Sequence, residues 1–412
     1  MNISPWPRVY VPQFPIALPD LALSGLTGTH SFKKKEFSMY VCGITPYDAT
    51  HLGHAATYLT FDLINRFLQT SGAEVNFVEN ITDIDEPLLE RATRDHVDWQ
   101  ELALQQVELF EADMSALHIL PPAHFVPATS VMAEIDEAIT RMSDNGYVYI
   151  LEGDLYFDVS SFLENLPLPI EEALNIFSSR GGDPERKGKR HPLDPVLWLA
   201  NRNGEPGWES SHGFGRPGWH IECCVISLRY LLGPNYLNFV DSGFLIDIQG
   251  GGSDLIFPHH FMSGAQAKAM TGRDFASAYI HTGMVGLDGE KMSKSKGNLV
   301  FVSKLLEAGI DPMAIRYALM TSHYSVDRMW TQDLLVNAQN SLSRIRENLS
   351  KSEVAPALPL LHNLSKALAN NLDTPSALLA IEDWCSASES NPEVDEAGIV
   401  SRALDSLLGL AL

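Results

Sequence analysis

Two short motifs in the sequence carry residue types suited to phosphate chemistry. The first, His51-Leu52-Gly53-His54, lies between an apolar run and a helix-like stretch. Backbone N–H groups at the start of a helix attract anions, and imidazoles can donate hydrogen bonds to phosphate oxygens. The second is DGEKMSKSKGN at 288–298, in which Lys291 and Lys294 lie among serines and glycines. Two lysines on such a loop suit the stabilisation of a phosphoryl-transfer transition state.

The cysteines suggest a different kind of chemistry. The chain has four, Cys42, Cys223, Cys224 and Cys385, which are too few and too scattered for a disulfide framework in a chain of 412 residues. Free thiols or metal ligands are therefore expected. Cys42 ends the apolar run just before the histidine motif, whereas Cys385 lies in a helical pattern and is expected to be a core residue.

Hydrophobic periodicity indicates the elements that must position these residues. The stretch 38–43 has the pattern of a buried strand, 54–71 has apolar residues at helical spacing, and 74–82 is strand-like again. A strand, helix and strand joined by short links predict a parallel sheet. Two further strands are expected around 244–254 and 277–286, helices over 87–145, and a wholly helical pattern beyond 304.

Composition and charge limit the class of protein. The net charge is −23, and the basic clusters, at 33–35 and 186–190, are short. Because phosphate neutralisation supplies much of the affinity for nucleic acids, nucleic-acid binding is not favoured. No apolar run approaches the roughly 20 residues of a membrane span, and the proline-rich start lacks the features of a signal peptide. A cytoplasmic protein without membrane contact is expected.

Taken together, the motifs resemble those of class I aminoacyl-tRNA synthetases, which activate a carboxylate with ATP. HLGH and KMSKS are the two signatures of that family, and its cysteine-activating branch is matched by YVCGITPYD, NITDIDE, GRPGWHIEC and GGGSDLIFPHH. The resemblance implies an α/β, Rossmann-like catalytic domain with a parallel sheet over 37–325. An inserted subdomain is expected at about 120–215, an N-terminal arm at 1–36 and a C-terminal helical domain at 326–412.

The resemblance also implies one zinc ion, which would bind the substrate thiolate directly and reject serine and alanine. Its expected ligands are Cys42, Cys223 and His259, with Cys224 and His260 as the neighbouring alternatives. Cysteinyl-tRNA synthetases have a glutamate as the fourth ligand, where this chain has Ser263. Three protein ligands would leave the fourth tetrahedral position to the substrate.

The same resemblance assigns roles around the adenylate. The phosphates of ATP, with Mg²⁺, are expected at His51, His54, Lys291 and Lys294, with Thr45 nearby. The adenosine is expected at Gly252, Ser253, Asp254 and Val285, and the aminoacyl part at Cys42, Gly43, Ile44, Thr45, Thr57, Asn80, Ile81, Thr82 and Trp219. Asp48 and His54 are candidates for the general base. The acidic run Asp83, Asp85 and Glu86 is expected to be a solvated helix start rather than a metal site.

The acceptor of the activated cysteine is expected to be an amino sugar. The segment 42–63 and the short acidic tail resemble the cysteine ligases of mycothiol biosynthesis, which form an amide with glucosaminyl-inositol. Two features depart from that family, namely Ser179 in place of a signature glutamate and an apparent insertion at 233–244. The alternatives are a short cysteinyl-tRNA synthetase and an inactive synthetase-like binding protein. A monomer acting on small molecules is expected.

Overall fold

The computed structural model describes residues 3–202, 204–239, 243–292 and 297–412. Its centre is a five-stranded sheet in which every neighbouring pair of strands is parallel. The strand order is β11 (Ala276–Thr282), β10 (Ile246–Gly252), β3 (Glu36–Ile44), β4 (Glu74–Ile81) and β5 (His124–Pro127). The α/β fold with a parallel sheet is thus confirmed. The chain adds strands to one side of β3 and later to the other, so the switch point lies between β3 and β10.

Side chains alternate across the sheet and divide the interior into two cores. On β3, Met39 and Val41 belong to the core around α1 (Leu52–Thr70), whereas Tyr40 and Cys42 belong to the core on the opposite face. The opposite face is covered by α6 (Trp219–Leu232) and α7 (Phe261–Thr271). Because successive residues of a strand point to opposite faces, this pattern places Cys42 toward α6.

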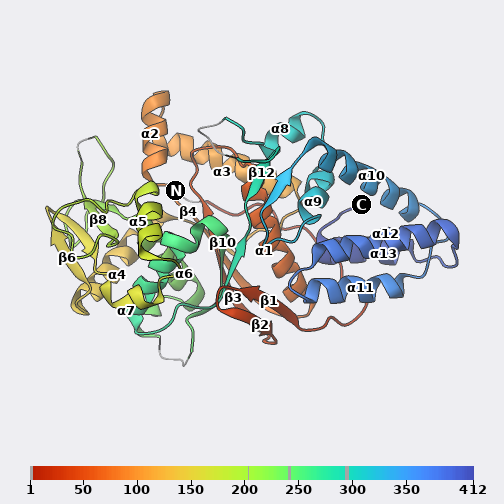
Figure 1. The fold of residues 1–412 in the computed structure, drawn as a ribbon, viewed down its shortest axis with the longest axis horizontal. Helices are drawn as coiled ribbons and strands as arrows, with labels where there is room; N and C mark the ends of the chain where they lie inside the picture. Colours follow the sequence, from red (N-terminus) through yellow and green to blue (C-terminus); the bar gives the residue numbers. More distant parts are fainter. Residues whose placement is uncertain (1–2, 203, 240–242, 293–296) are drawn as a thin grey trace.

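The segment between β5 and α6 forms a second, antiparallel sheet, which lies at one end of the molecule (Figure 1). Its strands are β6 (Val148–Leu151), β7 (Asp154–Phe157), β8 (Val196–Ala200) and β9 (Gly215–Pro217). Around it lie α4 (Met132–Asp144), α5 (Ile170–Ser179) and the short helices η1 (Ala128–Ser130) and η2 (Ser160–Asn165). β5 falls within the range expected for the insertion, yet it pairs with β4 in the central sheet.

Two helices connect β4 with β5, and the remaining short elements flank β10 and β11. The first pair is α2 (Glu86–Asp95) and α3 (Trp99–Ala116). The others are η3 (Tyr236–Asn238), η4 (Ser253–Leu255), η5 (Ile256–His260), β12 (Val285–Leu287) and β13 (Glu290–Lys291). The expected insertion at 233–244 contains η3, and its residues 240–242 lie outside the described part of the chain.

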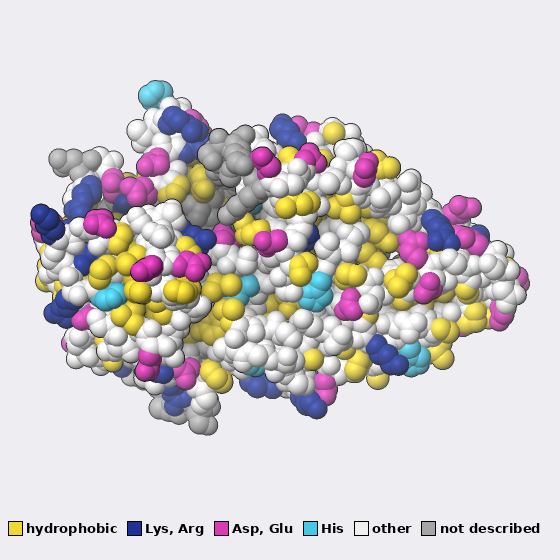
Figure 2. Space-filling model, in the orientation of Figure 1, with side chains coloured by type: hydrophobic (Ala, Val, Ile, Leu, Met, Phe, Trp, Pro, Cys, Tyr) yellow, Lys and Arg dark blue, Asp and Glu magenta, His cyan; other side chains and the backbone are white. Residues whose placement is uncertain are grey.

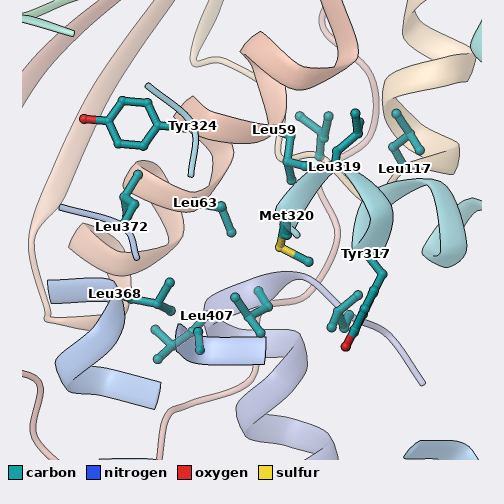
Figure 3. Close-up of a cluster of buried hydrophobic side chains, with 14 of the residues drawn as sticks. Leu59, Leu63, Leu117, Tyr317, Leu319, Met320, Tyr324, Leu368, Leu372 and Leu407 are labelled. Atoms are coloured by element: carbon teal, nitrogen blue, oxygen red, sulfur yellow. The ribbon is translucent and has the colours of Figure 1, made fainter. Parts of the chain in front are cut away.

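The C-terminal region is helical except for one short strand. Its helices are α8 (Val302–Glu307), α9 (Pro312–Met320), α10 (Gln332–Leu349), α11 (Ala357–Ala369), α12 (Thr374–Ser390) and α13 (Ala397–Leu408). The expectation of helix throughout was wrong at β14 (Arg328–Trp330), which pairs in parallel with β12. Figure 3 shows how side chains of α1, α9 and the C-terminal helices, including Leu59, Leu319 and Leu407, form one buried cluster.

A buried ionic network fixes α1 to the C-terminal helices. The carboxylate of Asp62 is bonded to Arg66 Nε at 2.9 Å and to the guanidinium of Arg316 on α9, and all three side chains are buried. The remaining N–H groups of the two arginines donate to backbone carbonyls, among them Arg66 to Asp405 O at 2.9 Å. Satisfying the charges in this way offsets the cost of their desolvation.

The N-terminal arm is packed along much of its length. It contains a hairpin of β1 (Leu21–Gly25) and β2 (Gly28–Phe32), and Trp6 Nε1 donates to Ile119 O at 2.8 Å. No described helix is long and apolar enough to cross a bilayer. The division of the chain at residues 36 and 325 stays a prediction, since the arm, the sheet and the C-terminal helices share one core.

Candidate active site

A cleft of about 910 Å³ opens at the carboxyl ends of the parallel strands. The ends of β3, β4, β10 and β11 meet there, as expected for ligand sites at the switch point of an open α/β sheet. Most of the predicted site residues line this one cleft, namely Cys42, Gly43, Thr45, His51, His54, Thr57, Asn80, Thr82, Trp219, Cys223, Gly252, Asp254, His259 and Val285.

Cys42, Cys223 and His259 come together at the buried end of the cleft. One ligand atom from each lies within 4.8 Å of the other two, and all three residues are buried. They come from β3, α6 and η5, three elements that are distant in sequence. Two sulfurs and an imidazole nitrogen at this spacing are a donor set that Zn²⁺ prefers.

The state of His259 fits a metal ligand. Its Nε2 atom is buried and has no hydrogen-bond partner among the described residues, whereas its Nδ1 atom lies 2.9 Å from Nδ1 of His220. Burial, with a smaller contribution from His220, holds the pKa of His259 well below its usual value, so the imidazole is neutral. A neutral ring held through one nitrogen with its other nitrogen unpartnered is how histidine binds metals.

The two neighbouring alternatives lie outside the three-residue group. Cys224 Sγ donates to the carbonyl of Ser263 at 3.4 Å, and Cys224 is not part of the three-residue group. His260 Nε2 lies 3.2 Å from Cys42 Sγ, while its Nδ1 contacts His281 Nε2 at 2.8 Å. His260 therefore contacts one member of the group without belonging to it. Ser263 is buried, with its hydroxyl directed to His220 O at 3.4 Å.

The histidine motif forms the first turn of α1. His51 is the N-cap, and its Nδ1 accepts hydrogen bonds from the backbone N–H groups of Gly53 at 3.1 Å and His54 at 3.4 Å. The rings of His51 and His54 stack with their centres 3.8 Å apart. This arrangement places two imidazoles at a helix N-terminus that faces the cleft, which favours an anionic ligand.

The lysine motif is only partly described. The backbone of Lys291 lies in β13, and Lys294 is among residues 293–296, which fall outside the described part of the chain. The segment that follows is bonded to the histidine motif, because Leu52 N donates to Val300 O at 2.9 Å and Val302 N donates to Thr50 O at 3.0 Å. Both flanks of the loop, at Met292 and Leu299, line the cleft.

Asn80 organises the floor of the expected adenylate pocket. Its Oδ1 accepts from Tyr40 OH and from Gly43 N, both at 2.8 Å, and its Nδ2 donates to Thr82 Oγ1 at 2.9 Å. Gly43 is required here, since a Cβ atom would lie 1.7 Å from the carbonyl oxygen of Asn80. Trp219 stacks on the ring of His259 at 4.1 Å and so connects this pocket to the group of three ligands.

Some predicted residues lie beside the cleft rather than in its wall. Ile44 and Ile81 are buried in the core, and Ser253 begins η4 next to the lining residue Asp254. Cys385 is a buried core residue of α12. Of the two candidate bases, Asp48 pairs with Arg91 at 3.2 Å, and both Asp48 and His54 line the cleft.

The acidic run does not match the expected solvated helix start throughout. Asp83 is fully buried and accepts from Thr129 N at 3.0 Å, because β4 and the turn after β5 lie side by side. Asp85 is the N-cap of α2 and lines the cleft, and Glu86 is exposed. The dipole contact expected for Asp85 is therefore present, whereas Asp83 is structural.

One wall of the cleft was identified from the sequence only in part, at the segment 179–184. It is formed by the second sheet and its loops and includes Tyr156, Ser179, Arg180, Asp183, Arg186, Arg202 and Arg216. Tyr156 OH donates to Asp183 at 2.5 Å, and Arg186 and Arg202 both bond the buried Asp154 at 2.7 Å. The signals were the family signature around Ser179 and the basic, irregular stretch 179–218, and neither shows which of the remaining side chains face the cleft.

Comparisons with known proteins show similarity over most of the chain. Residues 29–340 match the model of the tRNA synthetases class I (C) catalytic domain. The proteins named L-cysteine:1D-myo-inositol 2-amino-2-deoxy-alpha-D-glucopyranoside ligase from Streptomyces griseus and Gordonia bronchialis are 50% and 49% identical to this chain. The match to the Streptomyces protein covers 91% of this chain and 90% of that protein, and the match to the Gordonia protein covers 91% of each.

Among solved structures, Mycobacterium tuberculosis methionyl-tRNA synthetase in complex with methionyl-adenylate has a similar fold. The TM-score is 0.60 at 20% identity, over 92% of this chain and 89% of that one. At this identity the likeness concerns the fold alone, and it agrees with the parallel sheet and the C-terminal helices described above.

Proposed function

Because the chain belongs to the class I (C) tRNA synthetase family, and within it to the L-cysteine:1D-myo-inositol 2-amino-2-deoxy-alpha-D-glucopyranoside ligases, we propose that it joins L-cysteine to the amine of glucosaminyl-inositol. The reaction consumes ATP, with Mg²⁺, and passes through cysteinyl-adenylate to release pyrophosphate and AMP. It is a step of mycothiol biosynthesis. We further propose that the enzyme is monomeric, lies in the cytoplasm and has no nucleic-acid partner.

The observation that carries the proposal is the presence of two distinct sites in one cleft. Cys42, Cys223 and His259 gather at the buried end, and His51 and His54 lie at the start of α1. A zinc ion bound by the first three would take up the substrate thiolate and favour its deprotonated form, which serine cannot match. The histidines suit the phosphates of ATP.

In the first step the cysteine carboxylate attacks the α-phosphorus of ATP, and pyrophosphate leaves. We assign the stabilisation of the phosphates to His51 and His54, with Thr45 nearby and the N-terminus of α1 behind them. Lys291 and Lys294 are assigned to the same charge. Both flanks of their loop line the cleft, which supports that assignment.

In the second step the amine attacks the acyl carbon of the adenylate, and the bond to AMP breaks. The amine must be neutral at that moment, so a group has to accept its proton. Asp48 and His54 are the candidates in the cleft. An RNA acceptor is not favoured, since Lys and Arg side chains lie interspersed with Asp and Glu on the face shown in Figure 2.

The proposal is tested first by exchange of labelled pyrophosphate into ATP. Cysteine should support exchange at least about 100-fold better than serine, because only the thiolate can bind the metal. His54→Ala should lower exchange by about 10²-fold or more. The matched control His362→Ala, at an exposed position of α11, should leave it unchanged. Absence of exchange, or equal exchange with serine, would contradict the proposal.

A further inference from the structure

The carboxylate of Asp85 faces the cleft at the point where α2 begins. Asp85 is half-buried, and its Oδ1 accepts a hydrogen bond from Glu86 N at 2.8 Å. This bond uses part of the carboxylate's capacity, since each of the two oxygens can accept more than one donor. Burial, only partly offset by this bond and by Arg216, raises the pKa of Asp85 above its usual value.

The other half-buried carboxylates that line the cleft have a cationic partner, whereas the lining residues Glu86, Glu90 and Asp254 are exposed. These pairs are Asp48 with Arg91 at 3.2 Å, Asp183 with Lys189 at 2.8 Å and Glu205 with Arg216 at 2.9 Å. Asp85 has no ion pair among the residues that the structure describes. Arg216 is the cation that acts on Asp85, but its Nε is bonded to Glu205.

A second carboxyl group is buried near Asp85. Glu222 is 2% exposed, and its Oε2 has no hydrogen-bond partner within the described chain. Its electrostatic interaction with Asp85 and Asp83 places it behind the same stretch of the wall. Glu222 does not line the cleft itself, so Asp85 is the group that offers spare acceptor capacity to a ligand that brings N–H groups. A bound zinc ion would not offset the negative charge of Asp85, because two cysteine thiolates and the substrate thiolate would outweigh its two positive charges.

Asp85 lies where the cleft adjoins a second cavity. Asp85 interacts electrostatically with Cys223, and the next residue, Glu86, begins α2 and lines both spaces. A second cavity of about 530 Å³ adjoins the cleft between α2 and the second sheet. The two spaces share the lining residues Glu86, Glu90, Glu205 and Arg216.

We propose that Asp85 binds the ammonium group of the acceptor amino sugar, whose remaining hydroxyl-rich body occupies the adjoining cavity between α2 and the second sheet. Asp85 is thus a specificity residue for the acceptor, which is bound as a cation before it loses its proton and attacks. The inference rests on the proposed function, and it concerns the second substrate only.

The test is Asp85→Asn, which keeps the helix cap because asparagine caps as well as aspartate. The KM for glucosaminyl-inositol should rise by about 10- to 100-fold through loss of a charge-assisted bond. Cysteine-dependent pyrophosphate exchange should change by less than about twofold. Glu108→Gln, which removes the same charge from an exposed position on α3, should change neither value.

A neutral analogue of the acceptor provides a second readout. Glucosyl-inositol, with a hydroxyl in place of the amine, should inhibit the wild-type enzyme at least about 10-fold more weakly than the amine binds. In Asp85→Asn this difference should disappear.

Three outcomes would overturn the inference. An unchanged acceptor KM, or an unchanged preference for the amine over its hydroxyl analogue, would leave Asp85 without the assigned role. A raised KM for cysteine in the exchange reaction would assign Asp85 to the α-ammonium of cysteine instead. Lack of amide product with the wild-type enzyme would overturn the proposed function itself.

Discussion

The adjacent residues Cys223 and Cys224 offer a matched test of the metal site. Both are buried on α6, at 1% and 0% exposure, yet only Cys223 belongs to the group whose ligand atoms lie within 4.8 Å of one another. Cys224 Sγ is directed to the carbonyl of Ser263. Replacing either residue by alanine removes one buried sulfur atom. We expect Cys223→Ala to lose zinc and Cys224→Ala to keep it.

The expected difference in zinc affinity is large compared with the difference in stability. A structural zinc site binds its ion with roughly 10–16 kcal/mol, so the loss of one of three protein ligands should cost at least ~3 kcal/mol. That is about 100-fold or more in the dissociation constant. Each substitution also removes a buried sulfur from a packed core, at a cost of about 1 kcal/mol in unfolding free energy. The two variants should therefore unfold at similar denaturant concentrations.

The assay combines metal content after dialysis, competition with a chromophoric chelator, and denaturant unfolding of each variant. Wild type and Cys224→Ala should each retain close to one zinc per chain, and Cys223→Ala should retain close to none. Equal zinc affinity in the two variants, or loss of zinc only from Cys224→Ala, would refute the assignment of Cys223. Similar unfolding midpoints would exclude misfolding as the cause.

Further predictions concern the framework of the site. Gly43→Ala should lower the unfolding free energy by more than ~3 kcal/mol in denaturant unfolding, because the added Cβ meets the carbonyl of Asn80 at 1.7 Å. Asp62→Asn should cost about 3–5 kcal/mol by leaving its buried arginines uncompensated. Burial raises the pKa of Asp62, but its two arginines outweigh burial and hold the pKa below its usual value. The unfolding free energy of wild type should therefore decrease as the pH falls below about 4, and a pH series of unfolding should show no such decrease for Asp62→Asn. Burial raises the pKa of Asp113 to about 7. The unfolded chain therefore releases this proton at a lower pH than the folded chain, and wild-type stability should fall as pH rises from about 4 to 7. In denaturant unfolding, the unfolding free energy of Asp113→Asn should exceed that of wild type by about 2 kcal/mol at pH 8 and equal it at pH 4.

The sequence predicted the parts of the site that depend on local pattern. The strand ending at Cys42, the helix starting at the histidine motif and the return strand appear as β3, α1 and β4. These elements have clear periodicity and a parallel connection, and their ends fix the position of HLGH. Family motifs then pointed to three ligands that the fold brings within 4.8 Å.

Features that depend on distant neighbours were not predictable in the same way. Consecutive residues of a helix point about 100° apart, so only the packing of α6 on the sheet decides which of Cys223 and Cys224 faces the cleft. Asp83 is buried because its partner Thr129 is supplied from a distance of 46 residues. The strand β14 has three residues and exists through its pairing with β12, which no local pattern reveals. The charged wall of the second sheet depends likewise on the register of its strands.

The central claim is that this cleft activates cysteine and transfers it to an amine. The most direct measurement incubates the zinc-loaded protein with ATP and cysteine, divides the sample between glucosaminyl-inositol and cysteine tRNA, and determines the product masses. We expect an amide of cysteine with the amino sugar, together with AMP, and no charged tRNA. Charged tRNA without the amide would instead identify the chain as a short cysteinyl-tRNA synthetase.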